Sequence, residues 1–226
     1  MATPIGNLED ITLRALRILR GVDVVAAEDT RRTRVLLEAY GVHAPLVSYF
    51  AHNQARRGPE LLRRLQGGAR IALVTDAGTP GVSDPGFQLV RLCRDAGVPV
   101  VPVPGPSALV AALSAAGVPA DRFVFEGFLP VKAGRRLTRL RELGALGRPV
   151  VLYESPHRLL ATLEAIETVF GEAEVVVARE VTKRFEEFRR GTAAVLRTAF
   201  DAEGVRGEVT LVVNPRAALP SPADRD

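Results

Sequence analysis

The chain of 226 residues is poor in cysteine and histidine and has no long apolar run, and each shortage excludes a class of protein. Its single cysteine, Cys93, excludes an internal disulfide, and its three scattered histidines give no metal-ligand spacing. No apolar run approaches the roughly 18 residues of a membrane helix. The N-terminal residues lack the basic and apolar regions of a signal peptide. We therefore expect a cytoplasmic protein without a membrane segment or a bound metal.

Two nucleotide-binding signatures are also missing. The sequence has no G-x-G-x-x-G run and no Gly-Lys pair, which excludes a Walker A loop.

Residues 81–85, Gly-Val-Ser-Asp-Pro, come near the G-x-S-x-G elbow of serine hydrolases, but Pro85 stands where the last glycine is needed. A serine hydrolase is therefore a distant alternative.

The sequence is organised around a loop at residues 75–86 that is rich in glycine, proline, aspartate, threonine and serine. An aliphatic run at 71–74 predicts a strand before it, and an amphipathic run at 87–92 predicts a helix after it. Plain connections of this kind usually take about 2–6 residues, and this loop is longer. It is either a long plain turn or a ligand loop, because ligands bind at the carboxyl edge of open α/β sheets.

Strands and helices alternate over residues 1–118, which is typical of a doubly wound parallel sheet. Tight turns at 3–7 and 104–108 resemble the central loop in composition. Glu28 and Asp29 end the first predicted strand, either as site residues or as charges that complement the next helix. We expect strands at 22–27, 46–49, 71–74 and 98–103, and helices at 8–20, 31–40, around 61–65, at 87–92 and at 108–116.

A linker at 117–120 is expected to lead into a second α/β domain at residues 122–214. Its predicted strands are 123–128, 150–154, 174–180, 185–190 and 208–213, of which the third and fourth form an antiparallel pair. Ser155 and Pro156 are expected to open a helix as N-cap and first residue, and 193–200 is a further helix. Residues 215–226 are expected to form a disordered tail.

The net charge of +4 permits a polyanionic partner without requiring one. The location of the charge says more than its total. Segment 132–148 carries six Lys or Arg residues against the single acid Glu142. It is either a phosphate-binding surface or a solvated helix face.

Several segments together resemble one family. They are Ala-Thr-Pro-Ile-Gly-Asn-Leu-Glu-Asp-Ile-Thr at 2–12, Ala-Ala-Glu-Asp-Thr-Arg at 26–31, the loop 75–86, Phe-Glu-Gly-Phe-Leu-Pro at 125–130 and Tyr-Glu-Ser-Pro-His-Arg at 153–158, with shorter pieces within 178–191. In this order they resemble the bacterial ribosomal RNA small-subunit methyltransferase I family, ribose 2′-O-methyltransferases of the tetrapyrrole methylase superfamily. The likeness covers residues 2–213.

The resemblance implies two α/β domains, the first with a parallel sheet and the second with a mixed sheet, and the methyl donor S-adenosylmethionine in the cleft between them. It implies a homodimer that methylates the 2′-hydroxyl of a cytidine in the decoding region of small-subunit rRNA, either as naked RNA or in the assembled 30S subunit. No metal is required.

The resemblance places the donor on three loops of the first domain. Backbone N–H groups of Gly78, Gly105 and Ser107 suit the donor's carboxylate, and Asp76 or Asp84 suits its ammonium group. The implied donor-binding residues are Pro4, Gly6, Asn7, Asp76, Ala77, Gly78, Thr79, Pro80, Pro104, Gly105, Ser107 and Ala108.

Methyl transfer to a ribose hydroxyl is helped by a base or an oriented water. We expect Glu180 and Lys183 to be catalytic, with a surface ion pair as the alternative. Lys183 would act as a base only with a lowered pKa, and otherwise as a cation that stabilises an alkoxide. The expected RNA-contacting residues are Glu28, Asp29, Arg135, Arg136, Arg139, Tyr153, Ser155, His157, Arg158, Arg189 and Arg190, with helix capping the alternative for His157 and core packing for Tyr153.

Two rival functions stay open. A precorrin-type methyltransferase of the same superfamily would bind a tetrapyrrole, and the basic segment 132–148 argues against it. A non-catalytic ribosome-assembly factor would not bind the donor, and the three donor loops argue against that. The N-terminus departs from the family because Met1 abuts the turn at 3–7, so we expect a truncated first strand or a misassigned start.

Overall fold

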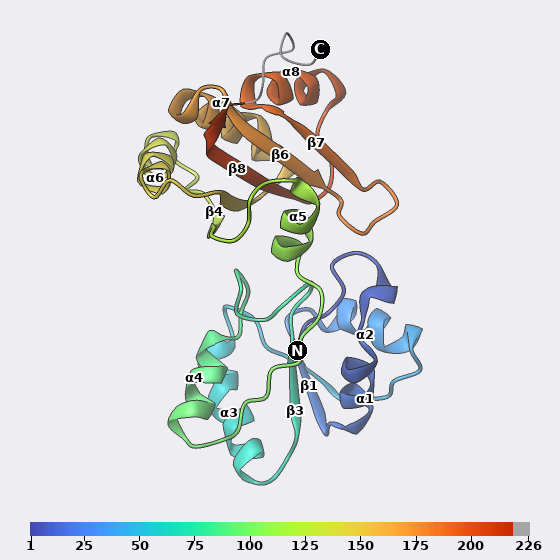
Figure 1. Ribbon diagram of the computed structural model, residues 1–226. Helices are drawn as coiled ribbons and strands as arrows, with labels where there is room; N and C mark the ends of the chain where they lie inside the picture. Colours follow the sequence, from blue (N-terminus) through green and yellow to red (C-terminus); the bar gives the residue numbers. More distant parts are fainter. Residues whose placement is uncertain (219–226) are drawn as a thin grey trace. The chain divides into compact units, whose positions relative to one another are not determined.

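The computed structural model describes residues 1–218 and divides into two compact units, Met1–Ser107 and Ala108–Asp226. This division puts residues 108–116 with the second unit, whereas the sequence placed them at the end of the first domain. Both units are α/β (Figure 1). None of the described helices combines the length and the apolar character that crossing a membrane requires.

The first unit is built around a parallel sheet of order β2-β1-β3. Helices α1 and α2 pack on one face of this sheet and α3 and α4 on the other (Figure 1). This is the doubly wound arrangement that the alternation predicted. In chain order its elements are a 3₁₀ turn at Leu8–Asp10, α1 (Leu13–Gly21), β1 (Val24–Ala27), α2 (Thr30–Ala39), β2 (Leu46–Ser48), α3 (Gln54–Gln66), β3 (Ile71–Val74) and α4 (Phe87–Asp95).

The predicted strand at 98–103 is wrong, because this segment joins no sheet in the described chain. Its sequence is Val-Pro-Val-Val-Pro-Val, and Pro99 and Pro102 have no N–H to give to a ladder. Its recorded backbone bonds run from the N–H of Val98 to the carbonyl of Cys93, at 2.8 Å, and from the N–H of Ala2 to the carbonyl of Val103, at 3.1 Å. The segment therefore runs to the turn at 104–108 outside the sheet.

The predicted single helix at 8–20 is also wrong, because it is interrupted before Leu13. Asn7 caps only the short 3₁₀ turn, and its side chain accepts from the N–H of Glu9. Thr12 then caps α1 by accepting from the N–H of Ala15 at 3.1 Å. Leu8, in the 3₁₀ turn, is 41% exposed.

The second unit has a mixed sheet of order β4-β5-β8-β6-β7, in which β6 and β7 are antiparallel as predicted. Helices α6, α7 and α8 pack on one face and α5 on the other (Figure 1). Its elements are α5 (Ala108–Ala116), β4 (Val124–Phe128), α6 (Ala133–Ala145), β5 (Val150–Glu154), a 3₁₀ turn at Pro156–Arg158, α7 (Leu159–Phe170), β6 (Ala173–Arg179), β7 (Glu187–Thr192), α8 (Ala193–Glu203) and β8 (Val209–Ala218).

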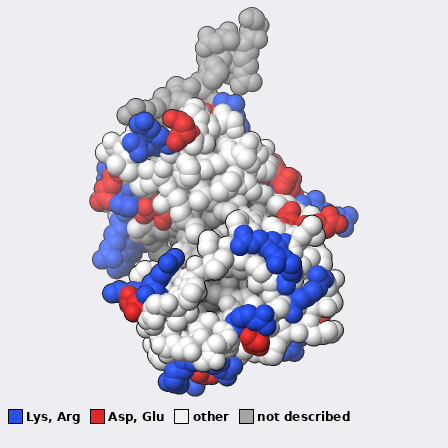
Figure 2. Space-filling model, turned by 60° about the horizontal axis from the view of Figure 1, so that its bottom comes forward, with Lys and Arg blue, Asp and Glu red and all other residues white. Residues whose placement is uncertain are grey.

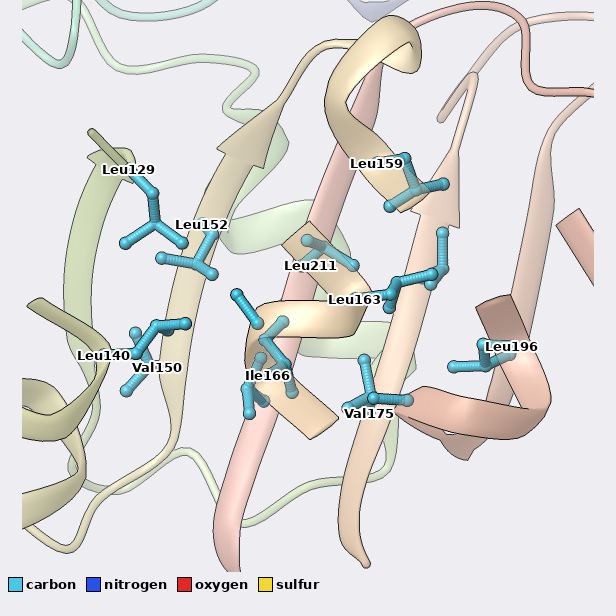
Figure 3. Close-up of a cluster of buried hydrophobic side chains, with 14 of the residues drawn as sticks. Leu129, Leu140, Val150, Leu152, Leu159, Leu163, Ile166, Val175, Leu196 and Leu211 are labelled. Carbon is cyan, nitrogen blue, oxygen red and sulfur yellow. The ribbon is translucent and has the colours of Figure 1, made fainter. Parts of the chain in front are cut away.

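The core of the second unit lies between the sheet and α6–α8. Figure 3 shows Leu163 and Ile166 of α7 pointing at Leu152, Leu211 and Val175 of the strands. All five side chains are fully buried, and each contributes roughly 1.5–3 kcal/mol relative to exposure. This packing fixes the strand ends and turns that carry the candidate residues.

The C-terminal end of the chain differs from expectation. Strand β8 runs on to Ala218, into the segment expected to be a disordered tail. Residues 219–226 of that predicted tail lie outside the described residues.

Candidate functional site

Two of the predicted donor loops are tied together by a backbone bridge between Thr3 and Gly78. The N–H of Thr3 donates to the carbonyl of Gly78 at 2.9 Å, and the N–H of Gly78 donates to the carbonyl of Thr3 at 3.0 Å. The buried hydroxyl of Thr3 also donates to the carbonyl of Thr75 at 3.1 Å. The turn at 3–7 therefore sits against the loop that follows β3.

The third loop meets the other two at Gly78. A Cβ added there would lie 3.6 Å from Ile5 and 3.8 Å from the carbonyl oxygen of Pro106. The hydroxyl of Thr79 donates to the same oxygen at 3.5 Å. Gly78 has φ +76°, which favours glycine. The structure thus brings together three loops that lie far apart in the sequence.

Three acids gather beside these loops: Glu28 after β1, and Asp76 and Asp84 in the loop after β3. The N–H of Asp29 donates to Asp76 Oδ1 at 2.9 Å, and the N–H of Asp76 donates to Glu28 Oε2 at 3.3 Å. Burial, then the charge of Glu28, raises the pKa of Asp84 to about 6. Burial also raises the pKa of Glu28. An unbalanced acidic group of this kind favours a cationic ligand.

The two roles considered for the Glu28–Asp29 pair divide between its members. Asp29 is the N-cap of α2, and its carboxylate accepts from the N–H of Arg31 at 2.8 Å. The hydrogen bond from the Arg31 side chain lowers the pKa of Asp29 to about 2. Glu28 instead points at Asp76. Asp29 is therefore a helix cap, and Glu28 belongs to the acidic group.

A hollow of about 80 Å³ in the first unit is lined by Thr3, Pro4, Arg32, Thr75 and Asp76, among others. Arg32 Nη1 lies 3.7 Å from Asp76 Oδ2. Pockets for whole small molecules usually measure about 300–1,000 Å³, so this hollow takes only part of such a ligand. Ala108, the last predicted donor residue, is the first residue of α5 in the second unit.

In the second unit, a buried acid organises the end of β5. Glu154 is 3% exposed and accepts from the N–H of Ser155 at 2.8 Å and from the hydroxyl of Thr162 at 2.6 Å. Arg158 Nε lies 3.3 Å from the same carboxylate, and its Nη2 donates to the carbonyl of Leu129 at 2.7 Å. The Ser155 side chain makes no capping bond, contrary to expectation. The exposed His157 lies in this turn.

Several predicted RNA residues converge near this turn. Tyr153 makes edge-to-face contacts with Phe125 and Phe128, and its hydroxyl accepts from the N–H of Leu109 at 3.2 Å. Arg136 is 8% exposed, and its Nη1 donates to the carbonyl of Val131 at 3.5 Å. Tyr153 lies at the carboxyl end of β5, and Arg136 lies in the first turn of α6, which follows β4.

The other predicted arginines are engaged in ion pairs. Arg139 binds Glu126 with two bonds of 2.7 Å and Glu142 with one of 2.7 Å. Arg189 pairs with Glu187 and Glu203, and Arg190 with the buried Glu174. Arg189 and Arg190 lie on β7, at one edge of the sheet. Arg136 follows β4, which is the opposite edge. The structure therefore does not gather the predicted RNA residues on one surface.

The predicted catalytic pair lies in the β6–β7 turn. Lys183 Nζ donates to Glu180 Oε1 and to Glu208 Oε2, both at 2.9 Å. Burial opposes the charge of Lys183, but these two bonds raise its pKa overall. Lys183 is thus a cation and does not meet the condition for a base.

Sequence reasoning missed Glu154, Thr162 and Glu208. An acid at the end of the apolar run at 150–153 was the available signal for Glu154, since a buried acid needs partners. Glu208 pairs with Lys183 across 25 residues, and no local pattern encodes that distance.

Figure 2 shows Lys and Arg side chains in separate groups on the face in view, some beside Asp or Glu. Within residues 1–218, no group of His, Cys, Asp and Glu side chains could hold a metal ion.

Comparisons with known proteins agree with these motifs. The family model described as Tetrapyrrole (Corrin/Porphyrin) Methylases matches residues 2–196. The chain is 51% identical to "Ribosomal RNA small subunit methyltransferase I" of Mesorhizobium japonicum, over 100% of this chain and 78% of that protein. It is 47% identical to the protein of that name from Thermotoga maritima, over 95% and 96%.

Among solved structures, a uroporphyrin-III C-methyl transferase from Thermus thermophilus complexed with S-adenyl homocysteine has a similar fold. Its TM-score is 0.63 at 20% identity, and the match covers 92% of this chain and 93% of that one.

Proposed function

The chain belongs to the tetrapyrrole methylase family and to its group of ribosomal RNA small subunit methyltransferase I proteins, and on that basis we propose that it methylates small-subunit ribosomal RNA with S-adenosylmethionine. The acceptor we propose is the 2′-hydroxyl of a cytidine in the decoding region. The observation that carries the proposal of rRNA methylation is 51% identity over the whole chain to a protein named "Ribosomal RNA small subunit methyltransferase I". We also propose a homodimer.

The first unit has groups that fit the donor. S-adenosylmethionine has a carboxylate, a cationic amino-acid end and an electrophilic methyl group on a sulfonium. Backbone N–H groups near Gly105 and Ser107, just before α5, suit the carboxylate. The acidic group of Glu28, Asp76 and Asp84 suits the cationic parts. The convergence of the three loops at Gly78 supports placing one ligand across them.

The protein's own part in the reaction is mainly positioning. Methyl transfer needs the acceptor oxygen in line with the methyl carbon, and fixing that geometry accounts for much of a rate enhancement. The acceptor hydroxyl must also lose its proton, and Glu180 is the proposed group near which this happens. The exposed Arg135 and His157 are proposed to contact RNA directly.

The test is titration calorimetry with S-adenosylmethionine, followed by transfer of a labelled methyl group. Small subunits from cells that lack the endogenous modification, the naked rRNA and a corrinoid are offered as acceptors. We expect donor binding and label on one cytidine ribose of the rRNA. Label on the corrinoid alone would favour the tetrapyrrole alternative, and absence of donor binding would favour a non-catalytic assembly factor.

A further inference from the structure

The turn between β6 and β7 holds a strained backbone. Glu180 has φ +50° and Thr182 has φ +68°, both in the left-handed region. Such a conformation is uncommon for any residue other than glycine and is a genuine outlier for a β-branched one. The hydroxyl oxygen of Thr182 is buried and has no hydrogen-bond partner among the described residues. Strain of this kind is concentrated at functional sites.

The strain is maintained by contacts from Gly207 and Glu208, just before β8. The N–H of Glu180 donates to the carbonyl of Glu208, and the N–H of Glu208 donates to Glu180 Oε1, both at 2.9 Å. A Cβ at Gly207, which has φ +84°, would collide with the Glu180 side chain. Glu180 Oε1 is therefore held by two donors, Glu208 N–H and Lys183 Nζ.

Lys183 is paired with two carboxylates, those of Glu180 and Glu208, so it is not free to bind a phosphate. Glu180 Oε2 has no recorded partner in the described part of the chain, and two bonds use only two of the three N–H donors of Lys183. One free acceptor beside one free donor matches a hydroxyl group, which both donates and accepts.

We propose that Glu208 and Gly207 are positioning residues that hold the Glu180–Lys183 pair ready for the substrate hydroxyl. This inference rests on the proposed function. Glu180 Oε2 accepts a hydrogen bond from the substrate hydroxyl. Lys183 Nζ donates a hydrogen bond to the oxygen of that hydroxyl. As the oxygen bonds to the methyl carbon, the C–S bond breaks with its electron pair left on sulfur, and the O–H bond breaks with its proton passing to Glu180.

A carboxylate of low pKa is sufficient for this step. Burial opposes the charge of Glu180, but the Glu208 N–H and Lys183 outweigh it and lower its pKa. An oxygen that is gaining a third bond becomes strongly acidic, so its proton passes to a weak base without difficulty.

The test is a double-mutant cycle in kcat for methyl transfer to small subunits. Glu180→Ala should lower kcat by about 10²–10⁴-fold, and Glu208→Gln by up to about 100-fold through misplacement of the pair. KM for the subunit and the donor Kd should change little. On a Lys183→Ala background, Glu208→Gln should cause no further loss, since its carboxylate acts through Lys183. Gly207→Ala should cost less on the Glu180→Ala background than on the wild type, because removing the Glu180 side chain removes the collision and leaves only the backbone strain at φ +84°.

Glu167→Gln is the matched control, since it breaks an exposed ion pair with Arg197 on α7 and α8. Thermal unfolding of each variant separates lost activity from lost folding. Equal losses from Glu208→Gln on both backgrounds, or nearly full kcat in Glu180→Ala, would overturn the inference while the wild type still methylates subunits. A wild type that transfers no methyl group would overturn the proposed function as well.

Discussion

At the scale of single residues, Asp84 is the group in the donor loops whose charge changes near neutral pH. Its pKa of about 6 lies above its ordinary value of 3.8, first because of burial and then because of the charge of Glu28. The stability that neutral Asp84 contributes is therefore fully present below pH 3.8 and is lost as the pH rises through about 6. Over the same pH range Asp84 loses its proton, and the resulting carboxylate attracts a cation.

We therefore expect S-adenosylmethionine to bind more tightly at about pH 7.5 than at about pH 5.5, where Asp84 is mostly neutral. Asp84→Asn should weaken binding at the higher pH and remove most of the difference. Calorimetry at the two pH values measures this. Asp23→Asn, an exposed aspartate paired with Arg70 in the same unit, is the control. A full pH dependence in Asp84→Asn would contradict the assignment.

Gly78 is the residue at which the three loops meet. Valine at φ +76° costs about 1–3 kcal/mol of strain, and its methyl groups would enter the space between Ile5 and Pro106. We expect Gly78→Val to stay folded by circular dichroism and to lose measurable donor binding in calorimetry. Gly68→Val is the control, because it has φ +92° and open space around it. Unchanged affinity in folded Gly78→Val would refute the donor placement.

At the scale of elements, helix caps decide where the first helix begins. The apolar periodicity from Leu8 to Leu19 suits one continuous helix, yet Thr12 takes an extended conformation and starts α1 anew. Its hydroxyl satisfies one of the N–H groups that a helix start leaves without a partner. The turn at 3–7 is thereby separated from α1 and is free to pair with the loop after β3.

Removing this cap should destabilise the first unit. We expect Thr12→Ala to lower the free energy of unfolding by about 1 kcal/mol and Thr12→Ser to lower it much less, because serine keeps the hydroxyl. Urea unfolding measures both variants. Equal losses in the two variants would instead assign the effect to the Thr12 methyl group, which both variants lack. That methyl group lies beside Gly105, 3.8 Å from where a Cβ would stand.

At the scale of the whole molecule, the net charge of +4 overstates how many cations are free to bind RNA. Arg139 is offset by Glu126 and Glu142. Arg135, one turn earlier on α6, is exposed and has no ion-pair partner in the described part of the chain. The affinity of a basic protein for RNA depends on the charges that replace counterions, and a paired charge replaces fewer.

We expect Arg135→Gln to reduce the salt dependence of binding to small subunits by about one unit of slope in log K against log salt. Arg139→Gln should reduce it less. Filter binding at several KCl concentrations measures both slopes. A larger change for Arg139→Gln would show that its ion pairs open when RNA binds.

The sequence by itself determined most elements and the family. Helix α5 has the predicted bounds, the antiparallel β6–β7 pair is confirmed, and β1 and β3 fall where aliphatic runs stand. Periodicity and turn residues act within a few positions, so they can be read locally. The long ordered motifs carried the family assignment for the same reason.

Only the tertiary structure decided which of these parts meet. It left 98–103 outside the sheet, paired Arg139 and Arg189 with acids, and joined Glu208 to the turn at Glu180. Each outcome depends on partners far apart in the chain, and on whether a charge or N–H group finds a partner once the cores have packed. No local pattern contains that information, because it arises only when the chain closes on itself.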